Sequence, residues 1–556
     1  MARASVLVAG AGPTGLALAC DLRRRGIDAQ VVESLRRPPV TTRALGIQPR
    51  GRQILDRLGA LGELERIADR RQTVDILVDG KLSAHIDMGS WRGPDRNNPL
   101  RAPQTAIEER LRERLRELGA EVRWGWAVSD IRQDTDGVDV IVESPEGSQT
   151  IRADWLIGCD GAHSVCRKLI GAKFEGGAYP QTFLLGDVRL TESHERGPTI
   201  FLRSGQILVT APLPSGRTRV GVALPPGDPL AAKGGEGLTA DRDKNSTSVE
   251  EGLARLQELY TEYSGDSAAR LEDATWLSVF RIHRRMASTF RRGRVLIAGD
   301  AAHLTSPLGG QGVNTGLNDA FNLGWKLAFV IQGRADERLI DTYEAERRPA
   351  VERIDRATAA WTSVLFGDSA GARFVRRWIV LPAMRSRYVQ AWVLTRRGAL
   401  QSSYHGGPLA QDAKTGPLGR ACQWGPQSGD GAPDVECRRR ADSGATTVGR
   451  EIGPNWGLIV FGSGDEATGA CQAAARKRLG EDLVVLSVVS GKEGGEVDAD
   501  RLLEDPGGKV ARAYGARAGA AILVRPDGHI AWRSAIADRR GLEAWIDGAL
   551  LEGRAG

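Results

Sequence analysis

The chain of 556 residues is poor in the residue types from which metal centres and disulfide frameworks are built. Its six cysteines are far apart and never in C-x-x-C spacing, and its seven histidines are scattered. We therefore expect reduced thiols and no metal site. Cys159 and Cys166 flank one turn region, where a disulfide or a metal is the less favoured alternative.

Long hydrophobic runs and blocks of like charge are also missing from the sequence. The nearest candidate for a membrane span, residues 378–394, is interrupted by a proline and two arginines, which favours an interdomain or dimer-facing helix. The net charge of +6 is spread along the chain, which argues against nucleic acid and suits an anionic dinucleotide. A strand pattern begins close to Met1, so we expect no signal peptide and a cytoplasmic location.

The composition is that of an ordinary globular protein. Hydrophobic residues make up 41% of the chain and charged residues 26%. A single hydrophobic core does not extend over so long a chain, so we expect two or three domains.

The first glycine-rich segment reads G-x-G-x-x-G at Gly10, Gly12 and Gly15, directly after the apolar run 6–8. Such a run favours a buried parallel strand. In this pattern the first glycine permits the tight turn, the second lets a pyrophosphate approach the backbone, and the third lets the helix pack closely on the strand. The free N–H groups at the start of the helix then face the anion.

The residues after these glycines continue the pattern with a helix over 16–25, Gly26 at its end, and a second strand over 29–32. Glu33 ends this strand, about 20 residues beyond the glycines, where an acid accepts hydrogen bonds from ribose hydroxyls. The segment therefore predicts a dinucleotide site. An ordinary strand–helix turn is the alternative, and the motif alone does not distinguish FAD from NAD.

A second glycine-rich segment begins at Gly299, where a buried strand ends in Asp300. A carboxylate at the carboxyl end of a strand lies in the ligand crevice, so we expect Asp300 to contact a ribityl chain. The helix that follows presents free N–H groups at its start, which would stabilise the negative charge of a reduced flavin. The backbone from Gly310 to Asn314 is thus predicted to hold the flavin ring. A turn capped by Asn314 or Thr315 is the alternative.

Three motifs occur in the order found in the FAD-dependent aromatic hydroxylases, the single-component flavoprotein monooxygenases similar to para-hydroxybenzoate hydroxylase. They are GAGPTG (10–15), CDGAHSVCR (159–167) and GDAAHLTSPLGGQGVNTGLNDA (299–320). The C-terminal part also resembles the thioredoxin-like extension of phenol hydroxylase and polyketide hydroxylase relatives. The resemblance therefore covers the whole chain.

The resemblance implies an α/β fold: a Rossmann-like FAD-binding domain, an inserted antiparallel-sheet substrate domain and a C-terminal thioredoxin-like domain. The two parts of the FAD-binding domain are implied to span 1–175 and 276–400, with interface helices in the second part. The substrate domain is implied to span 176–275, and residues 74–103 add strands to it. The linker and the thioredoxin-like domain are implied to span 401–556. In the last domain, Pro526-Asp527-Gly528 predicts the turn of a hairpin. The loop directly after Phe461 reads Gly-Ser-Gly-Asp-Glu and holds no cysteine, so no redox dithiol is expected there.

The resemblance also implies a set of FAD contacts. They are Gly10, Gly12, Pro13, Thr14, Gly15, Glu33, Arg43, Gln104, Val128, Asp160, Asp300, Gly310, Gly312, Val313 and Asn314. Asp160 is implied for both FAD and NAD(P)H, with Arg167 closing its motif, and Arg43 and Pro307 are the catalytic candidates near the flavin. His163, where many relatives carry arginine, and Val313, where they often carry methionine or leucine, depart from the pattern. His303 is expected to be a packed histidine rather than a catalytic one.

The implied activity is that of an FAD-dependent, NADPH-consuming monooxygenase. It would use molecular oxygen to hydroxylate a phenolic, polycyclic polyketide-type substrate through a flavin C4a-hydroperoxide. NADPH would bind transiently, because no second G-x-G-x-x-G follows a strand elsewhere. The alternatives are Baeyer–Villiger insertion, epoxidation, oxidation without oxygen transfer, or a non-catalytic flavoprotein that binds an aromatic drug. The resemblance is also compatible with a homodimer.

Overall fold

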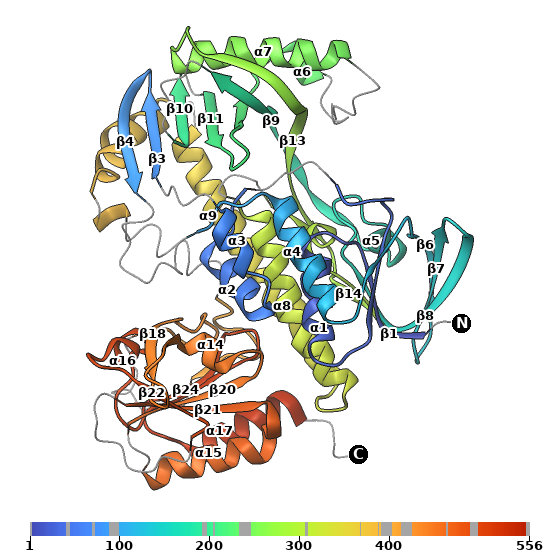
Figure 1. Cartoon of the computed structure of the whole chain (residues 1–556), viewed down its shortest axis with the longest axis vertical. Helices are drawn as coiled ribbons and strands as arrows, with labels where there is room; N and C mark the ends of the chain where they lie inside the picture. The colour runs from blue at the N-terminus through green and yellow to red at the C-terminus, as the bar shows by residue number, and fades with distance from the viewer. Residues whose placement is uncertain are drawn as a thin grey trace.

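The computed structural model describes residues 3–39, 45–68, 73–87, 99–191, 197–203, 206–232, 246–305, 310–366, 369–386, 388–390, 403–412, 425–462, 465–489 and 499–551. These residues build three sheets that lie one above another in Figure 1. The sheet of β9 to β13 lies at the top, the sheet of β1 and β8 in the middle with its helices, and the C-terminal sheet at the bottom.

The middle sheet holds the two strands that precede the glycine-rich segments. Its parallel strands are β1 (Arg3–Ala9), β2 (Ala29–Glu33), β5 (Val122–Trp124), β8 (Gly147–Gly158) and β15 (Val295–Ile297). The antiparallel strands β6 (Ala127–Gln133), β7 (Val138–Ser144) and β14 (Arg291–Arg292) extend it. Val6, Leu7 and Val8 of β1 are fully buried, as a parallel strand covered on both faces requires.

The helices of the middle layer pack tightly because glycines line their contact. They include α1 (Pro13–Arg23), α2 (Pro49–Leu58), α4 (Gln104–Glu117), α8 (Gly312–Ile331) and α9 (Arg338–Phe366). Helix α8 packs on α1, and a side chain at Gly316 or Gly324 of α8 would collide with Thr14 or Asp21 of α1. The helix is apolar around most of its circumference and is buried nearly throughout, as the sequence pattern predicts.

The top sheet is the antiparallel sheet that was expected after the first part of the FAD-binding domain. Its order is β16 (His303–Leu304), β13 (Arg270–Ala287), β9 (Phe174–Thr191), β12 (Thr218–Ala223), β11 (Gln206–Pro212), β10 (Thr199–Arg203), β3 (Thr73–Val78) and β4 (Lys81–Asp87). All neighbours are antiparallel except β10 and β3, which come from distant parts of the chain. No hairpin therefore constrains the relative direction of these two strands. Leu100 lies outside this sheet and forms a bridge with Ile47.

Two long strands, β9 and β13, run from the middle layer into the top sheet (Figure 1). The expected domain boundaries at 175/176 and 275/276 fall inside these strands, and the domain limits stay a prediction. Helix α7 (Ser246–Ser264) covers the face of the top sheet that is turned away from α1 and α8 (Figure 1).

The C-terminal sheet is mixed, with the order β17 (Gln411–Asp412), β24 (Ile530–Ser534), β23 (Ala521–Val524), β20 (Trp456–Phe461), β21 (Leu483–Val489), β22 (Arg501–Glu504), β18 (Glu436–Arg439) and β19 (Ala445–Thr447). Strands β20, β21 and β22 are parallel, and β23 and β24 form the predicted hairpin. Helices α15 (Glu466–Leu479) and α17 (Arg539–Ile546) pack against each other. The three sheets together confirm the predicted fold class.

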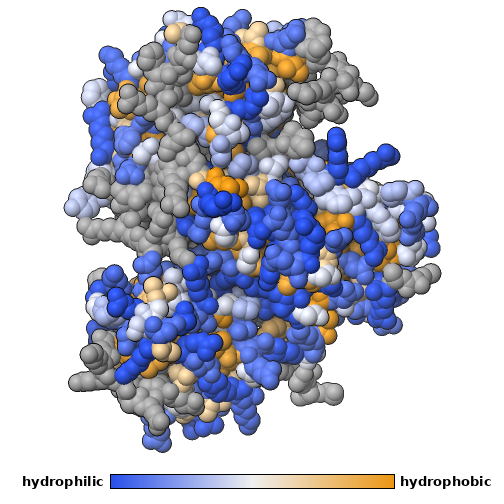
Figure 2. All heavy atoms as spheres, in the orientation of Figure 1, coloured by the Kyte–Doolittle hydropathy of each residue, from blue (hydrophilic) through white to orange (hydrophobic). Residues whose placement is uncertain are grey.

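The region predicted as a helix over 378–394 is helical at its start, where a π-helical turn continues directly into a short helix. A π-helical turn spans Arg376–Val380 and a short helix, α11, spans Leu381–Ala383, with residues 391–394 outside the described range. Leu381 is buried, whereas Trp378 is 64% exposed. On the face shown in Figure 2, hydrophobic residues are scattered among hydrophilic ones. Within the described residues, no helix is long and apolar enough to cross a membrane.

Candidate functional site

The three glycines of the first segment have three different surroundings. A side chain at Gly10, whose φ is +108°, would collide with the Cys159 carbonyl, and one at Gly15 would collide with the Gly10 carbonyl. A Cβ at Gly12 would meet no atom within 4 Å. Gly10 and Gly15 are therefore required by packing, whereas Gly12 leaves open space at the start of α1, which is where a pyrophosphate approaches in this motif.

The start of α1 has the properties of an anion site. Its N-cap residue is Gly12, no side chain caps the helix, and Pro13 occupies the first turn. The Glu33 carboxylate accepts hydrogen bonds from the backbone N–H groups of Ala11 at 2.8 Å and Leu35 at 3.0 Å. These contacts fix the acid beside the glycine turn. The residues present thus fit the adenosine pyrophosphate end of FAD.

Thr14 joins the two glycine-rich segments in space. A Cβ at Gly299 would lie 2.6 Å from the Thr14 hydroxyl, and a side chain at Gly316 would collide with the same group. Helices α1 and α8 therefore begin side by side, although their sequences are about 300 residues apart. Helix α8 also starts without a side-chain cap, and a Cβ at Gly310 or Gly312 would meet no atom within 4 Å.

Asn314 holds the start of α8 against the segment that follows Arg43. Its Oδ1 atom accepts a hydrogen bond from the Gln48 N–H at 2.8 Å, and its Nδ2 atom donates to the carbonyls of Gly46 at 3.0 Å and Gly310 at 2.7 Å. Asn314 is buried, and Val313 beside it is partly exposed. The asparagine therefore fixes the backbone around the proposed ring site and is not the simple helix cap that was the alternative.

Asp160 follows β8 and organises its own turn. Its Oδ1 atom accepts a hydrogen bond from the Ser164 hydroxyl at 2.5 Å, and its Oδ2 atom accepts one from the Cys166 N–H at 2.9 Å. Arg167 donates to the carbonyls of Ala162 and Ala301, both at 3.0 Å, and so links this turn to the start of the second glycine-rich segment, Gly299-Asp300, here called the G-D motif. Burial lowers the pKa of Arg167.

Asp319 is a buried residue at the site that the sequence reading did not single out. Its Oδ2 atom lies 2.6 Å from His303 Nε2 and accepts a hydrogen bond from the Gly299 N–H at 2.9 Å, while Oδ1 accepts one from Arg347 Nε at 2.6 Å. Burial alone would raise the pKa of Asp319, but His303 and Arg347 outweigh it and lower the pKa to about 2. His303 is 2% exposed and packed, as expected.

The remaining predicted contacts are less closely grouped. Asp300 lies in the exposed turn after β15, next to Gly299. Gln104 begins α4 and donates to Glu108 at 2.8 Å, and Val128 pairs with Val142 between β6 and β7. Both catalytic candidates, residues 43 and 307, lie outside the described residues.

The top sheet presents an apolar strip on the face opposite α7. Five partly exposed residues from neighbouring strands form one row across the sheet: Ile200, Val209, Gly221, Leu185 and Ser278. The stacked rings of Phe183 and Phe280, with centroids 5.9 Å apart, border the strip on one side. On the other side, a buried ion pair joins Arg219 to Asp187 at 2.7 Å, and Trp276 donates to the same carboxylate at 2.9 Å.

The cysteines are buried thiols. Cys20, Cys159, Cys166, Cys437 and Cys471 are all free and buried, and Cys422 lies outside the described residues. Burial raises the pKa of Cys20 to about 12 and that of Cys159 well above its usual range. No disulfide joins Cys159 to Cys166. None of the described cysteines therefore has the low pKa of a reactive thiol.

The paired helix starts and the glycine turn fit a protein that binds FAD at its two ends, and comparisons with known proteins place it in the class of flavoprotein monooxygenases. The family model described as "FAD binding domain" matches residues 3–358, and the one described as "Aromatic-ring hydroxylase, C-terminal" matches residues 425–550. The chain belongs to the FAD-dependent aromatic-ring hydroxylases.

Individual relatives share most of their length with this chain. It is 31% identical over 546 residues to 6-methylpretetramide 4-monooxygenase from Streptomyces rimosus, covering 95% of this chain and 90% of the relative. OxyS anhydrotetracycline hydroxylase from the same organism has a TM-score of 0.75 and 30% identity, covering 98% of this chain and 99% of that one. Aklavinone-11 hydroxylase, solved with FAD and aklavinone, has a TM-score of 0.74 and 25% identity over 99% of each chain.

Proposed function

We propose that this FAD-dependent aromatic monooxygenase consumes NADPH and hydroxylates a flat, polycyclic phenol of polyketide type. The observation that carries the proposal is the apolar strip of Ile200, Val209, Gly221, Leu185 and Ser278, which lies on the sheet face opposite α7. Its central position is a glycine, over which the apolar side chain of Leu185 lies, with Cδ1 2.8 Å from where a Cβ would be. The middle of the strip thus offers planar rings an apolar surface. The names of the similar tetracycline-pathway and aklavinone hydroxylases support the same substrate class.

The residues of this chain would bind FAD at its two ends. Gly12 and the start of α1 would hold the pyrophosphate, and Glu33 the ribose. Asp300 would contact the ribityl chain, and the backbone from Gly310 to Asn314 would hold the ring. The residues Pro13, Thr14, Gly15, Gln104, Val128 and Asp160 remain proposed contacts. FAD, when bound, would supply hydride acceptance and the activation of molecular oxygen.

The protein's own part in the reaction is to orient the substrate and to exclude water from it. The apolar strip and the Phe183–Phe280 stack would do both, because they give the substrate rings contact surface without charged groups. Asp187 and Arg219, which border the strip, form an ion pair and so neutralise each other. Arg43 and Pro307 remain the catalytic candidates, and NADPH, a homodimer and the cytoplasmic location remain predictions.

A screen of phenolic polyketides against the FAD-loaded protein tests the proposal. We expect a planar polycycle to stimulate NADPH oxidation and to gain one oxygen atom on a ring carbon, as shown by mass spectrometry and NMR. Ring insertion or an epoxide would identify the related oxygenations instead. Tight substrate binding with no stimulated NADPH oxidation across the screen would contradict catalysis and support the drug-binding alternative.

A further inference from the structure

The tip of the C-terminal hairpin, residues 525–529, is buried inside the molecule although its sequence is that of a polar turn. Arg525, Asp527 and His529 are each 0–1% exposed, and Gly528 in the turn has φ +78°. A charged turn is normally solvated, so burial of this one requires partners on the middle layer. Those partners come from α2, α8 and α9, and the starts of α2 and α8 border the proposed ring site.

The first set of partners is a cluster of charges on α8 and α9. Arg525 donates to Glu346 at 2.5 and 3.0 Å, and Lys326 donates to Glu346 at 2.7 Å. Asp527 forms an ion pair with Arg525 and lies 3.4 Å from the indole nitrogen of Trp325. Burial lowers the pKa of Lys326 to about 8, whereas Arg525 and Lys326 outweigh burial and lower the pKa of Glu346 to about 2.

A second route leads from the hairpin tip to the G-D motif itself. The ring of His529 stacks on that of Tyr404, with centroids 4.1 Å apart, and the Tyr404 hydroxyl accepts a hydrogen bond from Arg347 Nη1 at 3.2 Å. Arg347 in turn donates to Asp319, which holds the Gly299 N–H. Gly299 immediately precedes Asp300, the proposed ribityl ligand. Four buried side chains therefore connect the C-terminal domain to the flavin site.

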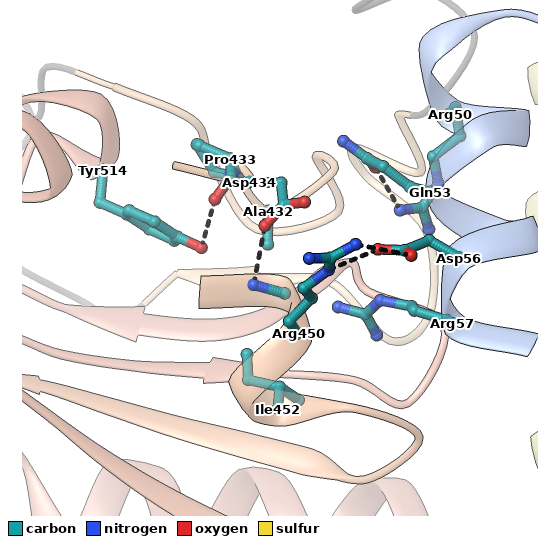
Figure 3. Close-up of a pocket in the computed structure, with 11 residues that line it drawn as sticks. Arg50, Gln53, Asp56, Arg57, Ala432, Pro433, Asp434, Arg450, Ile452 and Tyr514 are labelled. Atoms are coloured by element: carbon teal, nitrogen blue, oxygen red, sulfur yellow. Dashed lines mark hydrogen bonds and ion pairs between the residues drawn. The ribbon is translucent and has the colours of Figure 1, made fainter. Parts of the chain in front are cut away.

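A third route leads from the tip to α2. Arg50 donates to the Asp527 carbonyl and lies 3.3 Å from His529 Nδ1, and Arg57 donates to the Pro526 carbonyl at 3.2 Å. Figure 3 shows Arg50 and Arg57 extending from α2 toward the C-terminal domain, beside the ion pair of Arg450 and Asp56. Helix α2 begins one residue after Gln48, which Asn314 holds against the start of α8.

We propose that the 525–529 hairpin tip positions the flavin site from outside the FAD-binding domain. It does so by fixing α2 through Arg50 and the G-D turn through Tyr404, Arg347 and Asp319. The inference rests on the proposed location of FAD between the two glycine-rich segments. It gives the C-terminal domain, which has no dithiol at its expected position after Phe461, a role in cofactor binding. Tyr404 and Asp527 are positioning residues in this account.

The test uses full-length apoprotein titrated with FAD. Tyr404→Phe removes the hydroxyl that accepts the hydrogen bond from Arg347 but keeps the ring that stacks on His529. Asp527→Asn removes the charge of the turn residue and keeps its size. Arg450→Ala is the matched control, since its ion pair with Asp56 joins the same two domains at a more exposed position, with side chains 44% and 22% exposed. The readouts are the FAD dissociation constant, the visible circular dichroism of bound flavin and the melting temperature of the apoprotein.

We expect Tyr404→Phe and Asp527→Asn to raise the FAD dissociation constant at least fivefold and to alter the flavin dichroism. Arg450→Ala should leave both within twofold. Wild-type values for a folded Tyr404→Phe protein would overturn the proposal, as would an equal loss in Arg450→Ala at a matched melting temperature. If Asp527→Asn does not fold, Tyr404→Phe alone decides. None of these readouts needs turnover, so failure of the proposed hydroxylation would be seen separately.

Discussion

The side-chain amide of Asn314 accepts a hydrogen bond from the backbone N–H of Gln48 at 2.8 Å, across 266 residues of sequence. This contact joins the first turn of α8 to the entry of α2. Both elements border the site where the flavin ring is proposed to lie. One buried amide thus sets the relative position of two backbone segments, which explains why an asparagine rather than a small cap residue occupies this position.

Replacement of Asn314 by alanine removes three hydrogen bonds from a buried position. We expect the variant to lose about 1–3 kcal/mol of unfolding free energy, because the Gln48 N–H and two carbonyls lose their partner. The FAD dissociation constant should rise at least tenfold. Urea denaturation and FAD titration measure the two effects. Gln332→Ala, at the exposed far end of the same helix, is the control and should change neither quantity.

The surroundings of Gly12 and Gly15 predict opposite behaviour for the two alanine variants. Gly12→Ala places a methyl group in open space, so the apoprotein should melt at the wild-type temperature while FAD binding weakens at least tenfold. Gly15→Ala places the methyl group against the Gly10 carbonyl, so the apoprotein itself should be destabilised by about 1–3 kcal/mol. Calorimetry without and with FAD separates the two cases. A Gly12→Ala protein with wild-type FAD affinity would remove the pyrophosphate from this turn.

Gly221→Val tests the apolar strip. A Cβ at this position would meet only the flexible end of Leu185, whose Cδ1 lies 2.8 Å away, so the sheet should accept the substitution. It would raise the middle of the strip, and we expect KM for a polycyclic substrate to increase at least tenfold while the FAD spectrum and melting temperature stay unchanged. Ser215→Val, in the exposed turn of the same hairpin, should leave KM at the wild-type value. An unchanged KM in Gly221→Val would place the substrate elsewhere.

Local sequence patterns sufficed for the elements that carry the cofactor motifs. Three patterns depend only on residues that are close together in the sequence, and they predicted β1, α1 and α8. They are the apolar run in β1, the glycines at 10, 12 and 15, and the apolar periodicity of α8. The fold class followed from motifs in their order. The parallel pairing of β3 with β10 was not predicted, because it depends on a contact between strands more than 100 residues apart.

The buried charges were missed because their partners are distant in sequence. Asp527 reads as a turn residue, and nothing near it indicates that the turn is buried against Trp325 and Arg50. A signal did exist on α8: Asp319 and Lys326 are charged residues in a helix that is otherwise largely apolar, and such residues are buried only with partners. Finding those partners, Arg347 and Glu346, required the packing of α9.

The buried imidazole of His529 predicts how stability depends on pH. Burial, as the largest cause, lowers its pKa from 6.5 to about 4. Between pH 6.5 and 4 the unfolded chain therefore binds a proton at His529 that the folded protein does not bind. The contribution of His529 to the free energy of unfolding is fully present above pH 6.5 and is lost as the pH falls toward 4. The shift corresponds to about 3 kcal/mol of unfolding free energy.

We expect the urea-unfolding free energy of the wild type to fall across this pH range and that of His529→Gln to fall less steeply. The difference in slope should be confined to pH 4–6.5, the window set by His529. The carboxylates of Asp319 and Glu346 are present in both proteins, and their contribution to stability is lost only as the pH falls from their ordinary pKa values of 3.8 and 4.5 toward about 2. His85→Gln is the control, since it removes an imidazole whose side chain is 55% exposed instead of buried. Parallel pH profiles for wild type and His529→Gln would mean that His529 is protonated inside the folded protein, where Asp527 would then hold it as an ion pair.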